Sequence, residues 1–336
     1  MIKYFIASKL RANRNINAKG IFIWLLDKLL LLISPFIKYW EHRYINKYSS
    51  QPLKHQPIFI IGAPRTGSTI LYQMLTNHLD ITYISNLAAK LYRNIFFGIW
   101  LSNIIYKKNN HNNFISIHGD TTIGGYHAPN ECGSFWYRWL PTDRHYVDEN
   151  FLDNKSSTQI KQEITAITNY YDKPIAFKNL NAALRMRMLS KLFPEAKFIW
   201  IKRNPIYVSQ SILIAREKIN HNIVDWWSLM PFNYEKLKTL GPIEQVVEQI
   251  FSIEKQINND IRLFSSENLL ILHYENFDNY SGVMESIHNF IGKDINLNNS
   301  EQKPSIIIEE KYSFREEIIL SLKNKIETMN WLDYTN

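Results

Sequence analysis

A glycine-rich stretch at residues 62–69, "GAPRTGST", has the residue types and spacing of a phosphate-binding loop. Its two glycines let successive backbone N–H groups turn toward one anion, and the hydroxyls of Ser68 and Thr69 can add further donors. Nucleoside-triphosphate loops place a lysine after the second glycine, but here that lysine is absent and Arg65 lies inside the loop. The stretch therefore predicts a loop for a phosphate-like group whose cation is Arg65.

A second anion site is indicated by "RNPIYVSQS", residues 203–211. Arg203 follows an apolar run at 197–201, and ligands of α/β sheets gather at the carboxyl ends of strands. Ser211 comes about two helical turns later, and a guanidinium with a hydroxyl suits one more phosphate. At the strand ends, Glu275 is the only acidic candidate for a Mg²⁺ ligand. Two anion sites without an evident metal site suit a nucleotide with phosphates at both ends of its ribose.

The elements that must position these loops alternate along the chain from residue 57. Short apolar runs indicate strands at 57–62, 173–180, 196–205 and 268–277. Helical spacing of apolar residues occurs at 70–75, 184–192, 206–218 and 243–264. This alternation predicts an α/β, P-loop-like three-layer fold, in which helices flank a central parallel sheet. The polar segment 107–134 is expected to be a long loop region, and such loops are often functional.

The N-terminal segment is predicted to be a helical extension, residues 1–50, ahead of a domain at 51–336. Its core, residues 21–40, is strongly apolar, with Asp27 and Lys28 interrupting the run. Three alternatives are open for this helix: packing on the main domain, contact with a membrane interface or a hydrophobic substrate, and a transmembrane anchor. Basic residues precede it and suit anionic headgroups.

The composition limits which binding partners and which cellular compartment we expect. The net charge is +8 and the pI is about 9.2, which suits an anionic ligand or surface. Without a dense Lys/Arg block, a zinc-finger spacing or an RNA-binding aromatic motif, nucleic acid is not expected as a partner. Cys132 is the single cysteine, which fits a reducing compartment. We expect a cytoplasmic protein, with peripheral membrane contact through residues 21–40 as one of the three alternatives for that segment.

Four segments together resemble a known family, the sulfotransferases that use 3′-phosphoadenosine 5′-phosphosulfate (PAPS). They resemble the branch with a PRSGT-type loop, and the resemblance extends from residue 57 to about residue 317. The matching segments are "FIIGAPRTGSTIL" (59–71), "FPEAKFIWIKRNPIYVSQS" (193–211), "LHYENF" (272–277) and, more weakly, "EEKYSFREE" (309–317).

The resemblance implies a role for each matched residue and no metal. The 5′-phosphosulfate would be held by Arg65, Thr66, Gly67, Ser68 and Thr69. Within that set, Arg65 would stabilise the bridging oxygen as the sulfuryl group leaves. Arg203 and Ser211 would hold the 3′-phosphate, Tyr274 would lie near the adenine, and Tyr312 with Arg315 would close over the nucleotide. Relatives often carry Lys-x-Pro where this chain has "KNLNAAL" from Lys178, a departure that leaves the role of this lysine open.

An acceptor hydroxyl also needs a base to take its proton. The triplet Pro129–Asn130–Glu131 resembles a segment of the relatives that carries an acidic base candidate. Glu131 is therefore the preferred base, and His127 and His118 are the alternatives. A carboxylate in an apolar pocket has its pKa raised toward neutrality, which suits this role.

The predicted function is transfer of a sulfuryl group from PAPS to a hydroxyl acceptor. The apolar segment 21–40 and the aromatic stretch 226–232 favour a hydrophobic or lipid-like acceptor over a sugar. Two alternatives are a P-loop nucleotide-dependent kinase and a non-catalytic, membrane-associated binding protein that keeps the fold. The missing loop lysine counts against the kinase.

Overall fold

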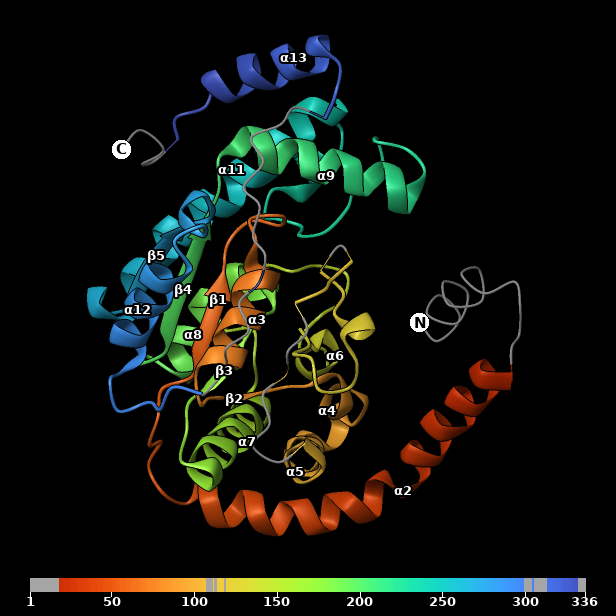
Figure 1. The fold of residues 1–336 in the computed structure, drawn as a ribbon, viewed down its shortest axis with the longest axis vertical. Coiled ribbons are helices and arrows are strands. Elements are labelled where there is room, and N and C mark those ends of the chain that lie inside the picture. The colour runs from red at the N-terminus through yellow and green to blue at the C-terminus, as the bar shows by residue number, and fades with distance from the viewer. Residues whose placement is uncertain are drawn as a thin grey trace.

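A parallel sheet forms the centre of the molecule (Figure 1). The computed structural model describes residues 18–106, 111, 114–117, 119–298, 304 and 313–331. Across this part of the chain the sheet has five parallel strands in the order β2-β3-β1-β4-β5. The strands are β1 (Ile58–Ile61), β2 (Thr82–Tyr83), β3 (Ile175–Phe177), β4 (Lys197–Lys202) and β5 (Leu269–His273).

The two faces of the sheet follow from the alternation of side chains along each strand. On β1, Phe59 and Ile61 join one core cluster, whereas Ile58 and Ile60 join the other. The first face packs against α7 (Asn154–Tyr171), α8 (Met186–Leu192), α9 (Pro205–Asn220) and α11 (Pro242–Asp260). The second packs against α3 (Ser68–His78) and α12 (Tyr280–Ile291). The predicted three-layer α/β fold is therefore confirmed.

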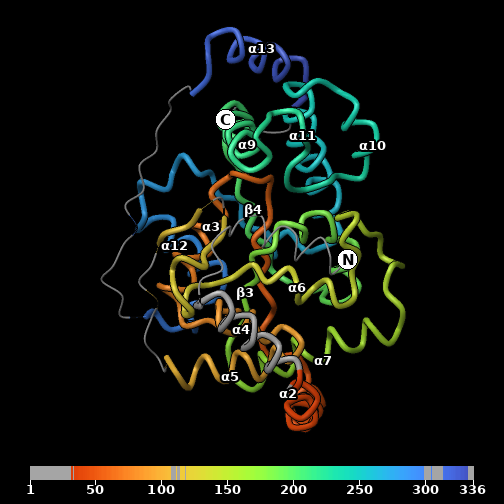
Figure 2. Tube along the Cα trace, turned by 90° about the vertical axis from the view of Figure 1, so that its right-hand side faces the viewer, coloured from red at the N-terminus to blue at the C-terminus, as the bar shows by residue number. Residues whose placement is uncertain are grey.

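The remaining helices are short or lie at the periphery (Figure 2). They are α4 (Asn86–Lys90), α5 (Ile95–Tyr106), α6 (Gly133–Trp136), α10 (Tyr234–Leu237) and α13 (Glu316–Glu327), with six 3₁₀ turns among the described residues. The four predicted strands and the helices that accompany them are confirmed. The sequence patterns missed the edge strand β2, which has only two residues.

The order of the strands determines where a ligand can bind. From β1 the chain runs through α3 to β2 at one edge of the sheet, while β4 pairs with the other side of β1. Such a switch point opens a crevice at the carboxyl ends of the two strands. Because Ile61 is paired with Trp200, the loops that follow β1 and β4 emerge side by side.

The described part of the N-terminal segment forms α2 (Ala18–Ser49), which lies within the predicted extension at residues 1–50. Its second half lies beyond the amino ends of the strands, along the lower edge of Figure 1, and packs on α7 and α5. Asn169 Nδ2 donates to the carbonyl of Tyr48 at 2.9 Å. The buried carboxylate of Glu41 accepts from Phe97 N and from Asn94 Nδ2, each at 3.1 Å. Within the described residues, no helix combines the length and the apolar character needed to cross a membrane.

Candidate active site

The loop after β1 has a backbone that only glycine fits at two positions. Gly62 has φ +147°, and a Cβ there would lie 2.5 Å from the carbonyl oxygen of Ile201. Gly67 has φ +96°, and a Cβ there would lie 2.3 Å from the ring of Tyr274. The loop leads directly into α3, which begins at Ser68. The exposed N–H groups and the dipole at the start of this helix favour an anion.

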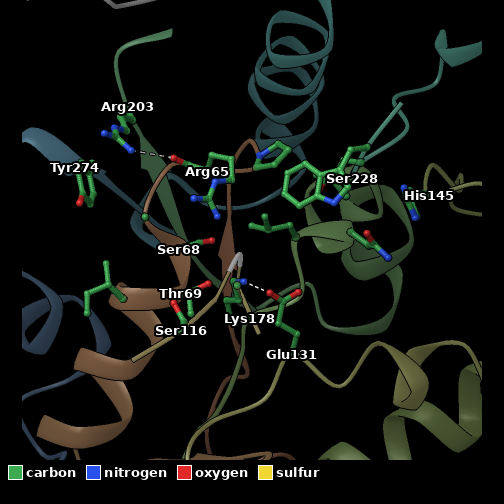
Figure 3. A pocket seen from close by; sticks show the side chains of 18 residues that line it. Arg65, Ser68, Thr69, Ser116, Glu131, His145, Lys178, Arg203, Ser228 and Tyr274 are labelled. Atoms are coloured by element: carbon green, nitrogen blue, oxygen red, sulfur yellow. Dashed lines mark hydrogen bonds and ion pairs between the residues drawn. The ribbon is translucent and has the colours of Figure 1, made fainter. Parts of the chain in front are cut away.

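Arg203 contacts the backbone of Arg65 in this loop (Figure 3). Arg203 Nη1 donates to the carbonyl oxygen of Arg65 at 3.3 Å, and Arg65 Nε donates to Ser211 Oγ at 2.8 Å. Burial, and then the nearby charge of Arg203, lower the pKa of Arg65. Among the described residues, neither arginine forms an ion pair with a carboxylate. An anion at this place would relieve the repulsion between the two cations.

The aromatic ring of Tyr274 lies between the loop after β1 and Arg203. The ring lies against Gly67, and the guanidinium of Arg203 stacks on it with its carbon 4.4 Å from the ring centroid. Tyr274 comes directly after β5, the neighbour of β4, and this order places it beside the two arginine loops. Its ring therefore forms a flat wall next to Arg203, suited to stacking with a nucleobase.

These loops line a cavity of about 440 Å³. Its residues come from the loops after β1, β3, β4 and β5, from the segment around Glu131, and from residues 227–229. Figure 3 shows Arg203 and Tyr274 at one end and His145 at the other, with Glu131 and Lys178 below Arg65. The cavity therefore has a cationic half and, beyond Lys178, a second half of mixed lining: Leu180, Asn181, His145, Trp227, Ser228 and Leu229.

Glu131 and Lys178 form an ion pair at the boundary between the two halves. The Lys178 side chain is 3% exposed, whereas that of Glu131 is 39% exposed and faces the cavity. A Cβ built on Gly119 would lie 3.4 Å from Glu131 Oε1, 3.6 Å from Thr69 Oγ1 and 3.8 Å from Lys178 Nζ. A carboxylate, a hydroxyl and an ammonium group thus converge beside the β1 loop, which is the set of groups that a proton transfer next to an anionic centre requires.

The comparison with protein families identifies the chain. A sequence model described as "Sulfotransferase family" matches residues 57–296, well over half of the chain. The chain belongs to the sulfotransferase family. The match begins at the strand that carries the phosphate-binding loop and extends beyond β5 and α12.

The comparison with solved structures finds several that are described as sulfotransferases. One from Mycobacterium avium is 14% identical, with 86% of this chain and 72% of that chain covered and a TM-score of 0.47. One from Mycobacterium tuberculosis is 12% identical, with 87% and 81% covered and a TM-score of 0.45. One from Alicyclobacillus acidocaldarius is 13% identical, with 81% and 96% covered and a TM-score of 0.40. A comparison with curated proteins finds no match.

The structure places some of the predicted site residues of this sulfotransferase in the cavity lining and others outside it. It brings together Arg65, Gly67, Ser68, Thr69, Arg203 and Tyr274 in the cavity lining, together with Glu131. Thr66 is buried, and its hydroxyl donates to the carbonyl of Ala63 at 2.9 Å, so its side chain stabilises the loop from within. Ser211 lies behind Arg65 as its hydrogen-bond acceptor.

His127, which the sequence offered as an alternative base, lies outside the lining of this cavity. Its ring stacks on Tyr106, with the centroids 4.4 Å apart, and lies beside Tyr83. Burial lowers the pKa of His127. The segment that carries His127 therefore packs this ring against Tyr83 and Tyr106, whereas Glu131, four residues later, lines the cavity.

Two predicted residues, His118 and Tyr312, lie outside the described residues. The chain that directly follows Tyr312 contacts α9. Ser313 N donates to Gln210 Oε1 at 2.7 Å, directly beside Ser211 on α9. Arg315 is exposed at the start of α13.

Residues in the second half of the cavity escaped the sequence patterns. His145 and Leu229 belong to segments without regular secondary structure, far from the loop motifs in the sequence. Trp227, which packing alone could have explained, lines the cavity beside them. The "WWSLMPF" stretch was the available signal. Among the described residues, no group of three or more His, Cys, Asp or Glu could hold a metal ion.

Proposed function

We propose that this sulfotransferase uses PAPS as its donor and a hydroxyl as its acceptor. The observation that carries the proposal is the pair Arg65 and Arg203, two partly buried cations without a carboxylate partner in the described chain. PAPS has an anionic group on each side of its ribose, and the pair suits both. The cavity's loop, helix start and aromatic wall fit the rest of such a nucleotide.

Each chain residue has a proposed role in binding the donor. The amides of the β1 loop, with Ser68 and Thr69, would hold the 5′-phosphosulfate. Arg203 and Ser211 would bind the 3′-phosphate. For this, the Ser211 hydroxyl would give up its hydrogen bond with Arg65 and donate to the phosphate instead. Tyr274 would stack on the adenine. Tyr312, outside the described residues, would close over the nucleotide together with the chain that docks on α9.

The chemical step needs charge stabilisation and a base. Bound PAPS supplies the sulfuryl group. Arg65, released from Ser211, would donate to the oxygen on which negative charge develops. Lys178 would neutralise charge on the equatorial oxygens, and Glu131 would accept the proton of the acceptor hydroxyl. The convergence of these groups around Gly119 supports this assignment, and the stacked ring of His127 does not suit the same role.

The experiment measures sulfated product formed from labelled PAPS with extracts and pure alcohols as acceptors. Arg65→Ala and Arg203→Ala are compared with Arg262→Ala, an exposed arginine outside the cavity. We expect the first two to lose product formation by about 10²-fold or more, and the third to leave it unchanged. Equal product from all three variants would contradict the site. Phosphorylated product from Mg²⁺–ATP, without sulfated product from PAPS, would support the kinase alternative.

For the acceptor we propose an apolar alcohol. Leu180, Trp227 and Leu229 line the second half of the cavity beside Asn181 and Ser228, and these three side chains favour an apolar group over a sugar. The exposed apolar face of α2 does not contribute to this lining. The cavity is lined by loops at the carboxyl ends of the strands, whereas α2 lies beyond their amino ends (Figure 1).

We also propose that α2 contacts an anionic membrane from the cytoplasmic side. Leu32, Phe36 and Tyr39 follow one another at i, i+4 and i+7, and each is more than 70% exposed. Lys38 and Arg43 are exposed on the same half of the helix. An apolar stripe with flanking cations suits the headgroup region of such a membrane. With α2 on the membrane, the cavity would face the aqueous phase.

A further inference from the structure

His145 lies at the end of the cavity opposite to Arg203 (Figure 3). Its Nδ1 accepts a hydrogen bond from Met230 N at 2.9 Å. Since a backbone N–H can approach only an unprotonated ring nitrogen, the proton of the neutral imidazole is on Nε2. The Met230 contact thus fixes both the tautomer and the orientation of the ring.

The surroundings of His145 keep its ring neutral. Burial, and then the charge of Arg185, lower the pKa of His145 to about 4. Arg185 is 2% exposed and donates from Nε to the carbonyl of His145 at 3.3 Å, so the cation is held against the histidine. At neutral pH the imidazole therefore presents a fixed N–H donor. No hydrogen bond from Nε2 to another described residue is present.

The apolar walls beside His145 are held in place by buried hydrogen bonds. Gln249 Nε2 donates to the carbonyl of Leu229 at 2.7 Å and to that of Trp227 at 3.0 Å. The fully buried Arg216 donates to Gln249 Oε1 at 3.4 Å. Because two buried side chains, Gln249 and Arg216, hold this loop, the space between Trp227 and His145 is formed before any acceptor binds.

We propose that His145 recognises the acceptor, by donating its Nε2–H to an oxygen that lies beyond the hydroxyl to be sulfated. The substrate class is an apolar alcohol or phenol with a carbonyl, carboxylate or ether oxygen at its far end. An ammonium group at that end would face an N–H donor and the cation Arg185 behind it, and is rejected. The assignment rests on the proposed sulfuryl transfer and adds the acceptor's chemistry to it.

The test uses four phenols that differ only at the far end: 4-hydroxyacetophenone, 4-hydroxyphenylacetate, 4-ethylphenol and tyramine. For each, kcat and KM are measured with PAPS as donor. We expect the two oxygen-bearing phenols to have a kcat/KM about tenfold above that of 4-ethylphenol, the value of one hydrogen bond to an N–H group. Tyramine is expected to be the poorest substrate.

Two variants separate recognition from support of the loop. In His145→Asn, Oδ1 takes the place of Nδ1 and still accepts from Met230 N, but the Nε2–H is lost. We expect this variant to raise KM for 4-hydroxyacetophenone about tenfold, while kcat/KM for 4-ethylphenol and the Kd of 3′-phosphoadenosine 5′-phosphate (PAP) stay unchanged. His221→Asn, at the exposed left-handed end of α9, is the control and should leave all values unchanged.

Three results would overturn the proposal. They are equal kcat/KM for 4-hydroxyacetophenone and 4-ethylphenol in the wild type, an equal loss for both in His145→Asn, and failure of all four phenols to be sulfated while PAP binds. Failure of the proposed function is distinct from these, because it would appear as the absence of PAP binding in the wild-type protein.

Discussion

Gly67 offers a direct test of the loop geometry. In Gly67→Ala, the left-handed backbone at φ +96° costs about 1–2 kcal/mol for a residue with a Cβ. The new methyl group would also lie 2.3 Å from Cδ2 and 2.6 Å from Cε2 of Tyr274, so the ring must move from its stack with Arg203. Overpacking of this kind costs about 1–3 kcal/mol. Together the substitution should lower the free energy of unfolding by about 2–5 kcal/mol.

The ring's share of this cost can be isolated in a double-mutant cycle. In a Tyr274→Ala background the methyl group has room, so Gly67→Ala should cost only the backbone part, about 1–2 kcal/mol. Chemical denaturation gives the four free energies, and the interaction energy should be about 1–3 kcal/mol. Calorimetry should show weaker binding of PAP by the single Gly67→Ala variant. Additive free energies, or unchanged PAP affinity, would refute the contact between Gly67 and Tyr274.

Three further predictions concern the base, the buried carboxylate and the membrane face. Glu131→Gln should lower kcat by about 10²–10⁴ whereas His127→Ala should leave kcat unchanged, and steady-state rates with PAPS would contradict the assignment if the two effects were reversed. Burial raises the pKa of Glu41 to about 7 in the folded chain. Between pH 4.5 and 7 the native state therefore binds more protons than the unfolded chain, so the free energy of unfolding should fall by up to about 3 kcal/mol as the pH rises through that window. The free energy of unfolding, measured by denaturation at each pH, should change less with pH in Glu41→Gln than in the wild type. An equal change in both proteins would rule out the effect. Phe36→Ser should reduce sedimentation with phosphatidylserine vesicles without changing the Kd of PAP, and a wild-type protein that fails to sediment with these vesicles would exclude the membrane contact.

The parts of the fold that sequence could predict are those with a local signal. The run 58–61 is uniformly apolar because β1 is buried on both faces, and its glycine loop needs φ values that only glycine readily takes. Arg203 was predictable for a related reason, since it follows β4, whose central residues 198–201 are all apolar. From these signals the sequence alone placed Arg65 and Arg203 at the carboxyl ends of strands in one parallel sheet.

The remaining features depend on contacts between distant segments. β2 has two residues, too few for any periodic pattern, and exists because it pairs with β3. His127 and Glu131 are four residues apart, and only the folded chain shows that one stacks on Tyr106 while the other meets Lys178. His145 belongs to an irregular segment whose position depends on Met230 and Arg185, so the sequence carried no local sign of it.

The central claim, two anion sites served by Arg65 and Arg203, is tested most directly by comparing PAP with AMP, which lacks the 3′-phosphate. Calorimetry without Mg²⁺ should show that the wild type binds PAP roughly 10- to 100-fold tighter than AMP, the value of one or two charge-assisted hydrogen bonds. Arg203→Ala should remove that difference by weakening PAP alone. Equal affinities for PAP and AMP in the wild type, or tighter binding of Mg²⁺–ATP than of PAP, would contradict the account.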